Sequence, residues 1–154
     1  MRRLFTLMAL LAAGTAASAQ PPRPSVQHYG APSLGGQPLP FSAAVRAGDV
    51  LYLSGQIGVG QDGRLPTGVE AQTRQAMENI GAVLRSAGRG WDDVFHCTAM
   101  LDNMSDWPAF NRVYVTFFTP GRLPARSALG ADGLALGALV ELECQAWAGP
   151  PARR

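Results

Sequence analysis

Leu139-Val140-Glu141-Leu142-Glu143-Cys144-Gln145-Ala146-Trp147 decides the fold, because apolar and polar residues alternate along this stretch. Such alternation predicts a β-strand that buries one of its faces. One face carries Val140, Leu142, Cys144 and Ala146, and the other carries Glu141, Glu143, Gln145 and Trp147. The first face can pack against helices, whereas the second has the mixed polarity of a surface that another subunit completes.

Upstream of this strand, Pro124-Ala125-Arg126-Ser127 places a fixed cation at the start of a short strand predicted for residues 126–131. A guanidinium is a planar fork that matches a carboxylate, and a carboxylate on a neighbouring strand can position or deprotonate a water. We therefore interpret the two stretches as a pocket that holds an organic acid through Arg126 and a water near Glu143. A strand arginine paired with a strand glutamate, without a catalytic role, is the alternative that these residues leave open.

Working outward, the pattern predicts the order strand-strand, helix, strand, helix, strand-strand. The strands are predicted at residues 41–45, 50–57, 94–101, 126–131 and 139–147, and the helices at 69–87 and 106–118. The longer helix follows from apolar residues at three- and four-residue spacing, and Gly88 ends it. In the strand at 94–101, one face is expected to carry Phe95, Cys97, Ala99 and Leu101. This order predicts an α+β fold in which both helices pack on one face of the sheet.

The first residues are predicted to be a secretory signal peptide, residues 1–19. Arg2 and Arg3 form a basic region, an apolar run follows, and the small residues Ala17-Ser18-Ala19 form a site for cleavage after Ala19. The apolar run is too short for a comfortable membrane span. We expect an exported protein, periplasmic in a Gram-negative host, that is not anchored to the membrane.

The mature chain is expected to hold one folded domain, at residues 40–148. Residues 20–39 are rich in Pro, Gly, Ser and Gln, which is typical of an irregular arm, and residues 149–154 are expected to be a flexible tail. With 47% hydrophobic and 16% charged residues, the chain can bury a core.

The charge balance changes when the signal peptide is removed. The full chain has 13 arginines, no lysine and 11 acidic residues, whereas the mature chain has 11 arginines and 11 acidic residues. A neutral chain without an arginine cluster does not favour nucleic acid as a partner, and the lack of lysine excludes Schiff-base chemistry through a lysine amine. His96 has no second ligand at a suitable spacing, so no metal site is expected.

Two cysteines, Cys97 and Cys144, lie in the middle of predicted strands. An oxidising compartment allows them to form a disulfide, but free cysteines are also common in buried strands. We expect two buried thiols, and the sequence leaves the disulfide open.

Taken together, the motifs resemble those of the Rid proteins, the reactive intermediate deaminases, which are also called the YjgF family. The matching pieces span roughly residues 40–147 and only their combination in this order is specific. They are Pro40-Phe41-Ser42, Ala44-Val45, Ser54-Gly55-Gln56-Ile57, Ala71-Gln72-Thr73, Asn79-Ile80, Asp106 to Phe110, Asn111-Arg112-Val113-Tyr114, Phe117-Phe118, Pro124-Ala125-Arg126-Ser127 and Val140-Glu141-Leu142-Glu143.

This resemblance implies a chorismate-mutase-like α+β fold with a mixed sheet, assembled as a homotrimer around a central β-barrel. The active sites would lie between subunits. The implied activity is the hydrolysis of 2-imino acids, the tautomers of reactive enamines, to 2-keto acids and ammonia. The resemblance implies no metal and no organic cofactor.

The resemblance also assigns roles to individual residues. Arg126 would hold the substrate carboxylate and Glu143 would hold or activate the attacking water. Gly55 would allow close approach of the backbone to the ligand, and the backbone N–H of Ala128 would donate to the substrate carboxylate. Asn111 would support the site from behind or lie at the subunit interface.

Two residues depart from the archetypal deaminases. Phe41 stands where those enzymes have a tyrosine, and Ala128 stands where they commonly have a cysteine. Both departures favour an alternative, a non-catalytic trimer that binds small carboxylic acids or partner proteins, whereas Arg126 and Glu143 favour catalysis. A third hypothesis, endoribonuclease activity, is disfavoured by the neutral mature chain. The sequence does not identify the imino acid or the reason for export.

Overall fold

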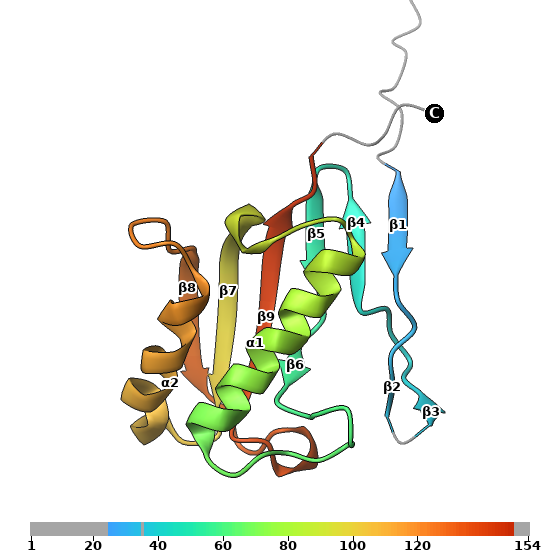
Figure 1. The fold of residues 1–154 in the computed structure, drawn as a ribbon. Helices are drawn as coiled ribbons and strands as arrows, with labels where there is room; N and C mark the ends of the chain where they lie inside the picture. The colour runs from blue at the N-terminus through green and yellow to red at the C-terminus, as the bar shows by residue number, and fades with distance from the viewer. Residues whose placement is uncertain (1–24, 35, 150–154) are drawn as a thin grey trace, which may run out of the picture.

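The computed structural model describes residues 25–34 and 36–149, and Figure 1 shows their arrangement. The predicted signal peptide lies outside the described residues, as does all of the predicted tail except Gly149. Most of the described strands form one seven-stranded sheet with the order β1-β4-β5-β9-β7-β8, in which β6 also pairs with β9. The strands are β1 (Val26–Tyr29), β4 (Ala44–Ala47), β5 (Val50–Leu53), β6 (Gln56–Ile57), β7 (Val94–Leu101), β8 (Ala125–Gly130) and β9 (Val140–Trp147).

The sheet is mixed, because β7 and β8 are parallel whereas the other pairs are antiparallel. Strand β9 lies in the middle of it and pairs with β7 from Val140 to Ala146. Its burial follows the predicted alternation, with Val140, Leu142, Cys144 and Ala146 buried and the intervening residues partly or fully exposed. The prediction for the last strand is therefore confirmed.

Two helices, α1 (Val69–Ser86) and α2 (Trp107–Tyr114), cover one face of this sheet. The apolar stripe of α1 packs against β9 and supplies Met77, Ile80 and Leu84 to the core. Gly88 has a φ of 70°, which a glycine adopts without strain, and it ends the helix as predicted. No described helix is both long and apolar enough to cross a membrane. The prediction of an α+β fold with both helices on one face is confirmed.

Three local predictions are wrong. The segment predicted as an irregular arm contains β1 and a small second sheet of β2 (Ser33–Leu34) and β3 (Gln37–Pro38). The predicted strand at 50–57 is divided, because pairing with β9 is interrupted between Leu53 and Gln56. Phe95 is 43% exposed rather than buried, because an irregularity in the pairing of β7 with β9 brings Val94 into the core instead.

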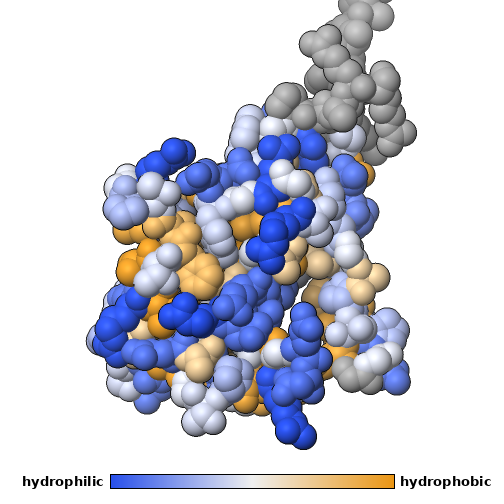
Figure 2. Space-filling view, in the orientation of Figure 1, coloured by the Kyte–Doolittle hydropathy of each residue, from blue (hydrophilic) through white to orange (hydrophobic). Residues whose placement is uncertain are grey.

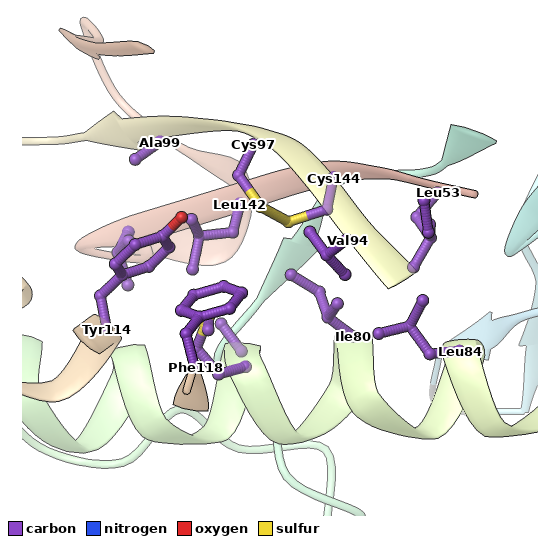
Figure 3. Close-up of a cluster of buried hydrophobic side chains, with 14 of the residues drawn as sticks. Leu53, Ile80, Leu84, Val94, Cys97, Ala99, Tyr114, Phe118, Leu142 and Cys144 are labelled. Atoms are coloured by element: carbon purple, nitrogen blue, oxygen red, sulfur yellow. A yellow bond between two sulfur atoms is a disulfide. The ribbon is translucent and has the colours of Figure 1, made fainter. Parts of the chain in front are cut away.

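The expectation of two free thiols is also wrong, because Cys97 and Cys144 form a disulfide (Figure 3). The two residues lie directly opposite each other on antiparallel strands β7 and β9, with their Cα atoms 4.1 Å apart. This distance is close to that of a pair without mutual backbone hydrogen bonds, in which side chains approach closely. Burial was predicted correctly, since both side chains are at most 1% exposed.

Candidate active site

A pocket of about 550 Å³ is lined by residues of β6 and of the segment between β8 and β9. Both segments lie at the lower end of the sheet in Figure 1. The pocket is also lined by two residues that the sequence had nominated, Phe41 and Gly55, and by Glu141 on β9. Leu34 and the following Leu39 form part of one wall, and Leu136 lies across from the sheet in the segment before β9. The pocket has the size of a small-molecule site.

Glu141 and Gly55 lie in direct contact in this pocket. A Cβ atom added to Gly55 would lie only 2.0 Å from Oε1 of Glu141, so no other residue fits here without moving the carboxylate. The close approach expected at Gly55 therefore exists, although the group that approaches is the carboxylate of Glu141. The carboxylate lies beside the gap between β5 and β6, where the pairing with β9 is interrupted.

The environment of Glu141 makes its carboxyl harder to ionise than that of an ordinary glutamate. Burial raises the pKa of this carboxyl above its ordinary value of 4.5, and the nearby charge of Glu143 raises it further. Desolvation and a like charge both disfavour ionisation. A carboxyl whose pKa is shifted toward neutrality is better suited to exchange protons with a substrate than an ordinary surface glutamate.

Hydrogen bonds from side-chain amides hold the backbone segments around the pocket in position. The Nδ2 of Asn79, on α1, donates to the carbonyl oxygens of Ile57 and Val59 at 3.0 Å each, which ties the β6 region to the helix. The buried Gln72 accepts a hydrogen bond from the backbone N–H of Leu139 at 2.8 Å. This bond fixes the start of β9, two residues before Glu141.

Arg126 lies elsewhere, on the helix-covered side of the edge strand β8. Its guanidinium carbon lies 4.8 Å from the ring centre of Trp107, 5.2 Å from that of Phe110 and 4.6 Å from that of Tyr114. These distances are within the range of cation–π contacts, which hold a guanidinium without using up its hydrogen-bond donors. Within the described part of the chain Arg126 makes no ion pair, so its charge is available to a carboxylate ligand.

The structure does not bring the predicted site residues together in one subunit. Arg126 is paired in register with Cys97, and Ala128 with Ala99, so both side chains face the helices. Glu143 is paired with Thr98 and lies exposed on the opposite, open face of the sheet. Asn111 lies half-buried on α2, next to Phe110 in the chain. Only Phe41 and Gly55 of the predicted set line the pocket.

Sequence reasoning chose Glu143 where the structure places Glu141 in the pocket. Both glutamates point to the same side of β9, so alternation alone could not separate them. Gly55 is the feature that distinguishes the two glutamates. Strand β6 pairs with β9 at Glu141, and this pairing brings Gly55 beside Glu141. Among residues 25–34 and 36–149 no cluster of three or more His, Cys, Asp or Glu side chains has the arrangement of a metal site.

Comparison with known proteins places this geometry in a family. The sequence profile of the family described as Endoribonuclease L-PSP matches residues 36–148. The 2-iminobutanoate/2-iminopropanoate deaminase of Mus musculus is 39% identical over 113 residues, which are 72% of this chain and 83% of the mouse protein.

Solved structures agree with the sequence comparison. A protein of unknown function from Yersinia pestis, YyfA of the conserved Rid family, superposes with a TM-score of 0.73 at 36% identity, over 80% of this chain and 99% of that one. TdcF of E. coli, solved with bound serine, superposes with a TM-score of 0.69 at 30% identity, over 74% and 92% of the two chains. The chain therefore belongs to the Rid family, also called the YjgF family.

Proposed function

We propose that this protein hydrolyses 2-imino acids to 2-keto acids and ammonia. The observation that carries the proposal is the carboxylate of Glu141, which is held against Gly55 in a pocket and has a raised pKa. Relatives support it, since the mouse protein is named a 2-iminobutanoate/2-iminopropanoate deaminase. One role suggested by the sequence changes: the carboxylate proposed to activate the water is Glu141 rather than Glu143.

The reaction needs little more than a positioned water and a proton acceptor. In a protonated imine, C2 is already electrophilic; water attacks it, a C–O bond forms, and Glu141 accepts a proton from the water. Glu141 then returns the proton to the nitrogen of the resulting carbinolamine. The hydroxyl of the carbinolamine then gives its proton to Glu141 as the C–N bond breaks, so that ammonia leaves and the C=O of the keto acid forms. General acid–base help of this kind is worth on the order of 10²–10⁴-fold in rate.

Arg126 is the proposed anchor for the substrate carboxylate, and it reaches the pocket from a neighbouring subunit. Within one chain Arg126 lies on the helix side of β8, whereas Glu141 lies on β9 with its side chain toward the other face. Strand β8 is at the edge of the sheet, where its outer backbone groups are free to meet another subunit. The backbone N–H of Ala128, two residues after Arg126, is proposed to assist this anchor.

A homotrimer would supply that neighbour. The open face of the sheet exposes Tyr52, Leu129 and Trp147 by 47%, 47% and 49%. Large side chains left exposed on an uncovered sheet face are typical of a surface that a partner buries. A closed ring of three subunits would bury these residues and would create three equivalent sites between subunits.

Binding without catalysis is the second candidate function. Phe41 places a ring where a hydroxyl would assist the reaction, and it is 46% exposed in the wall of the pocket. The related TdcF has been solved with bound serine, a small molecule with a carboxylate. A binding protein would use the same Arg126 and the same pocket, but substitution of Glu141 would leave its function intact.

Export is proposed together with this function. The disulfide between Cys97 and Cys144 supports it, because such bonds persist in oxidising compartments and are rare in the cytosol. N-terminal sequencing of the protein secreted by its host would test it. A mature chain that begins at Gln20 is expected, whereas a retained Met1 would contradict export.

Turnover by the purified mature protein tests the activity. An amino-acid oxidase generates the imino acid in situ, catalase removes the peroxide, and release of ammonia and keto acid is followed against spontaneous hydrolysis. We expect acceleration by the wild type that Arg126→Ala abolishes and Arg112→Ala preserves. Arg112 is a matched control because it is also an arginine but lies on α2, at the surface, in an ion pair with Glu70. No acceleration of any imino acid would favour binding alone.

A further inference from the structure

The wall of the pocket opposite the sheet contains a leucine in an unusual conformation. Leu136 has a φ of 59° and a ψ of 16°, in the left-handed region. Among residues 25–34 and 36–149 it is the sole non-glycine residue with a positive φ. A residue with a Cβ is strained there, and such strain persists where the surrounding structure enforces it, often at sites that clamp a ligand.

Core packing does not explain the strain at Leu136. The residue is 58% exposed, so its side chain gains little from burial within this chain. The flanking Gly133 and Gly137 also have positive φ values, of 81° and 72°, which a glycine adopts freely. The chain thus has glycines near this sharp turn, yet it has a leucine with a positive φ at a position that lines the pocket.

Leu136 belongs to an apolar wall. Leu34, Leu39, Phe41, Ile57 and Val59 line the same pocket. These side chains come from β2, from the segment after β3, from β6 and from the residues that follow β6. Of the residues that line the pocket, Glu141 is the sole charged one, and it is assigned to the imine end of the substrate.

We propose that this wall, with Leu136 as its clamp, selects 2-imino acids that carry a large apolar side chain. The inference rests on the proposed function, because it names the substrate class of that same site. The carboxylate of such a substrate lies at Arg126 of the neighbouring subunit and its C2 lies near Glu141. The side chain then extends toward Leu136 and Phe41. The smallest substrate, 2-iminopropanoate, has only a methyl group, which is too short to contact this wall.

The effect of an apolar pocket on kcat/KM can be estimated from the number of methylene groups that it holds. Each methylene placed in an apolar pocket changes kcat/KM by about 10-fold or more. The imino acids derived from leucine, methionine and phenylalanine should therefore have kcat/KM values at least about 10-fold above that of the alanine-derived one. An imino acid with a carboxylate side chain, derived from glutamate, should be the poorest, because its second negative charge would lie against the apolar wall of Leu136 and Phe41 without a cation to balance it.

The test compares these substrates in the wild type, Leu136→Gly and Leu136→Asn. Both substitutions tolerate a positive φ, so the fold is relaxed rather than damaged. We expect each to raise KM and lower kcat/KM about 10-fold for the leucine- and phenylalanine-derived imino acids, with little change for the alanine-derived one. Val26→Asn is the matched control, since Val26 is 59% exposed and lies on β1 away from the pocket.

The outcomes separate the two proposals. Acceleration of all imino acids to the same extent, or a preference that both Leu136 variants retain, would overturn the clamp and leave the deaminase standing. Absence of acceleration for the alanine-derived as well as the larger imino acids would overturn both. A preference for apolar side chains that Leu136→Gly and Leu136→Asn remove and Val26→Asn keeps would establish the clamp.

Discussion

The carboxylate of Glu141 occupies the space that a side chain at position 55 would need, with Oε1 2.0 Å from where a Cβ of Gly55 would lie. The lack of a side chain at Gly55 therefore makes room for the Glu141 carboxylate of the same chain; it is not needed for a backbone turn. Two segments that are far apart in the sequence meet at this point, and the pocket depends on their contact.

Gly55→Ala should damage activity far more than stability. The added methyl group displaces the flexible end of Glu141, which costs about 1 kcal/mol or less because the side chain can rotate away. A displacement of about 1 Å at a reacting group can reduce kcat by about 10²-fold. Gly90→Ala is the control, because nothing lies within 4 Å of its added Cβ. Equal activity of the two variants would show that the position of Glu141 does not matter.

Glu141→Gln should lower turnover by about 10²–10⁴-fold, whereas Glu143→Gln should leave most of it. The reason is that Glu141 lines the pocket and Glu143 lies on the exposed part of β9. Steady-state kinetics of both variants with one imino acid would decide between the two glutamates. The reverse result would restore the role that the sequence suggested for Glu143.

The same substitution should stabilise the protein at neutral pH. The pKa of Glu141 is higher in the folded chain than its ordinary value of 4.5, so the unfolded chain releases this proton first as pH rises. The stability that protonated Glu141 contributes is thus present below that value and is lost as pH rises through the folded pKa. Glu141→Gln should raise Tm at pH 7 and raise it less at pH 4. A Tm gain of equal size at both pH values would contradict the raised pKa.

Tyr114→Phe should make the protein more stable. The Tyr114 hydroxyl is buried without a hydrogen-bond partner in the described residues, and in Figure 3 it points toward the sheet. Removing an unsatisfied buried hydroxyl should gain about 1 kcal/mol in the free energy of unfolding. Urea titration at pH 7 would measure it, with the exposed Tyr52 changed to Phe as control. A loss of stability would mean that the hydroxyl has a partner, such as one supplied by assembly.

Alkaline pH gives a second measure of Tyr114. Burial raises its pKa to about 12, and the charge of Arg126 acts in the opposite direction more weakly. Because the unfolded tyrosine ionises near its ordinary value of 10.0, stability should fall as pH rises from there toward 12. Tyr114→Phe should remove this part of the fall. An unchanged pH dependence would place the tyrosine in contact with water.

Reduction of the disulfide should destabilise the fold. Cys97 and Cys144 are 47 residues apart, and closing a loop of that size is worth about 4 kcal/mol in the chain-entropy treatment. Dithiothreitol should lower the Tm of the wild type and have no effect on a Cys97→Ala, Cys144→Ala double variant. Two titratable thiols in the unfolded, unreduced protein would show that the bond does not form.

The regular elements were predictable because their signals are local. The apolar spacing in α1 and the alternation in β9 each span several turns or pleats, and both elements begin and end within a residue of the prediction. The strand at β7 was predicted at its full extent, although the irregularity at Phe95 was not, because nothing in the local pattern reveals how its partner strand is paired.

The site could be predicted only in part because it depends on register. Alternation shows that Glu141 and Glu143 share a face, but only the pairing of β6 with β9 selects Glu141. Register also decides that Cys97 lies opposite Cys144. The opposite orientations of Arg126 and Glu141 could not be derived from either strand alone, since they follow from how β8 and β9 are each paired with β7.

Subunit complementation is the measurement that tests the account most directly. Arg126→Ala and Glu141→Gln are each expected to be inactive, and the two chains are co-expressed with different tags so that mixed oligomers can be purified. If Arg126 and Glu141 meet across an interface, some sites in the mixture contain neither substitution. Every mixed cyclic trimer contains one site in three with neither substitution, so roughly a third of wild-type turnover should return in the purified mixed trimers. Mixed oligomers that stay as inactive as the two parents would contradict a site shared between subunits.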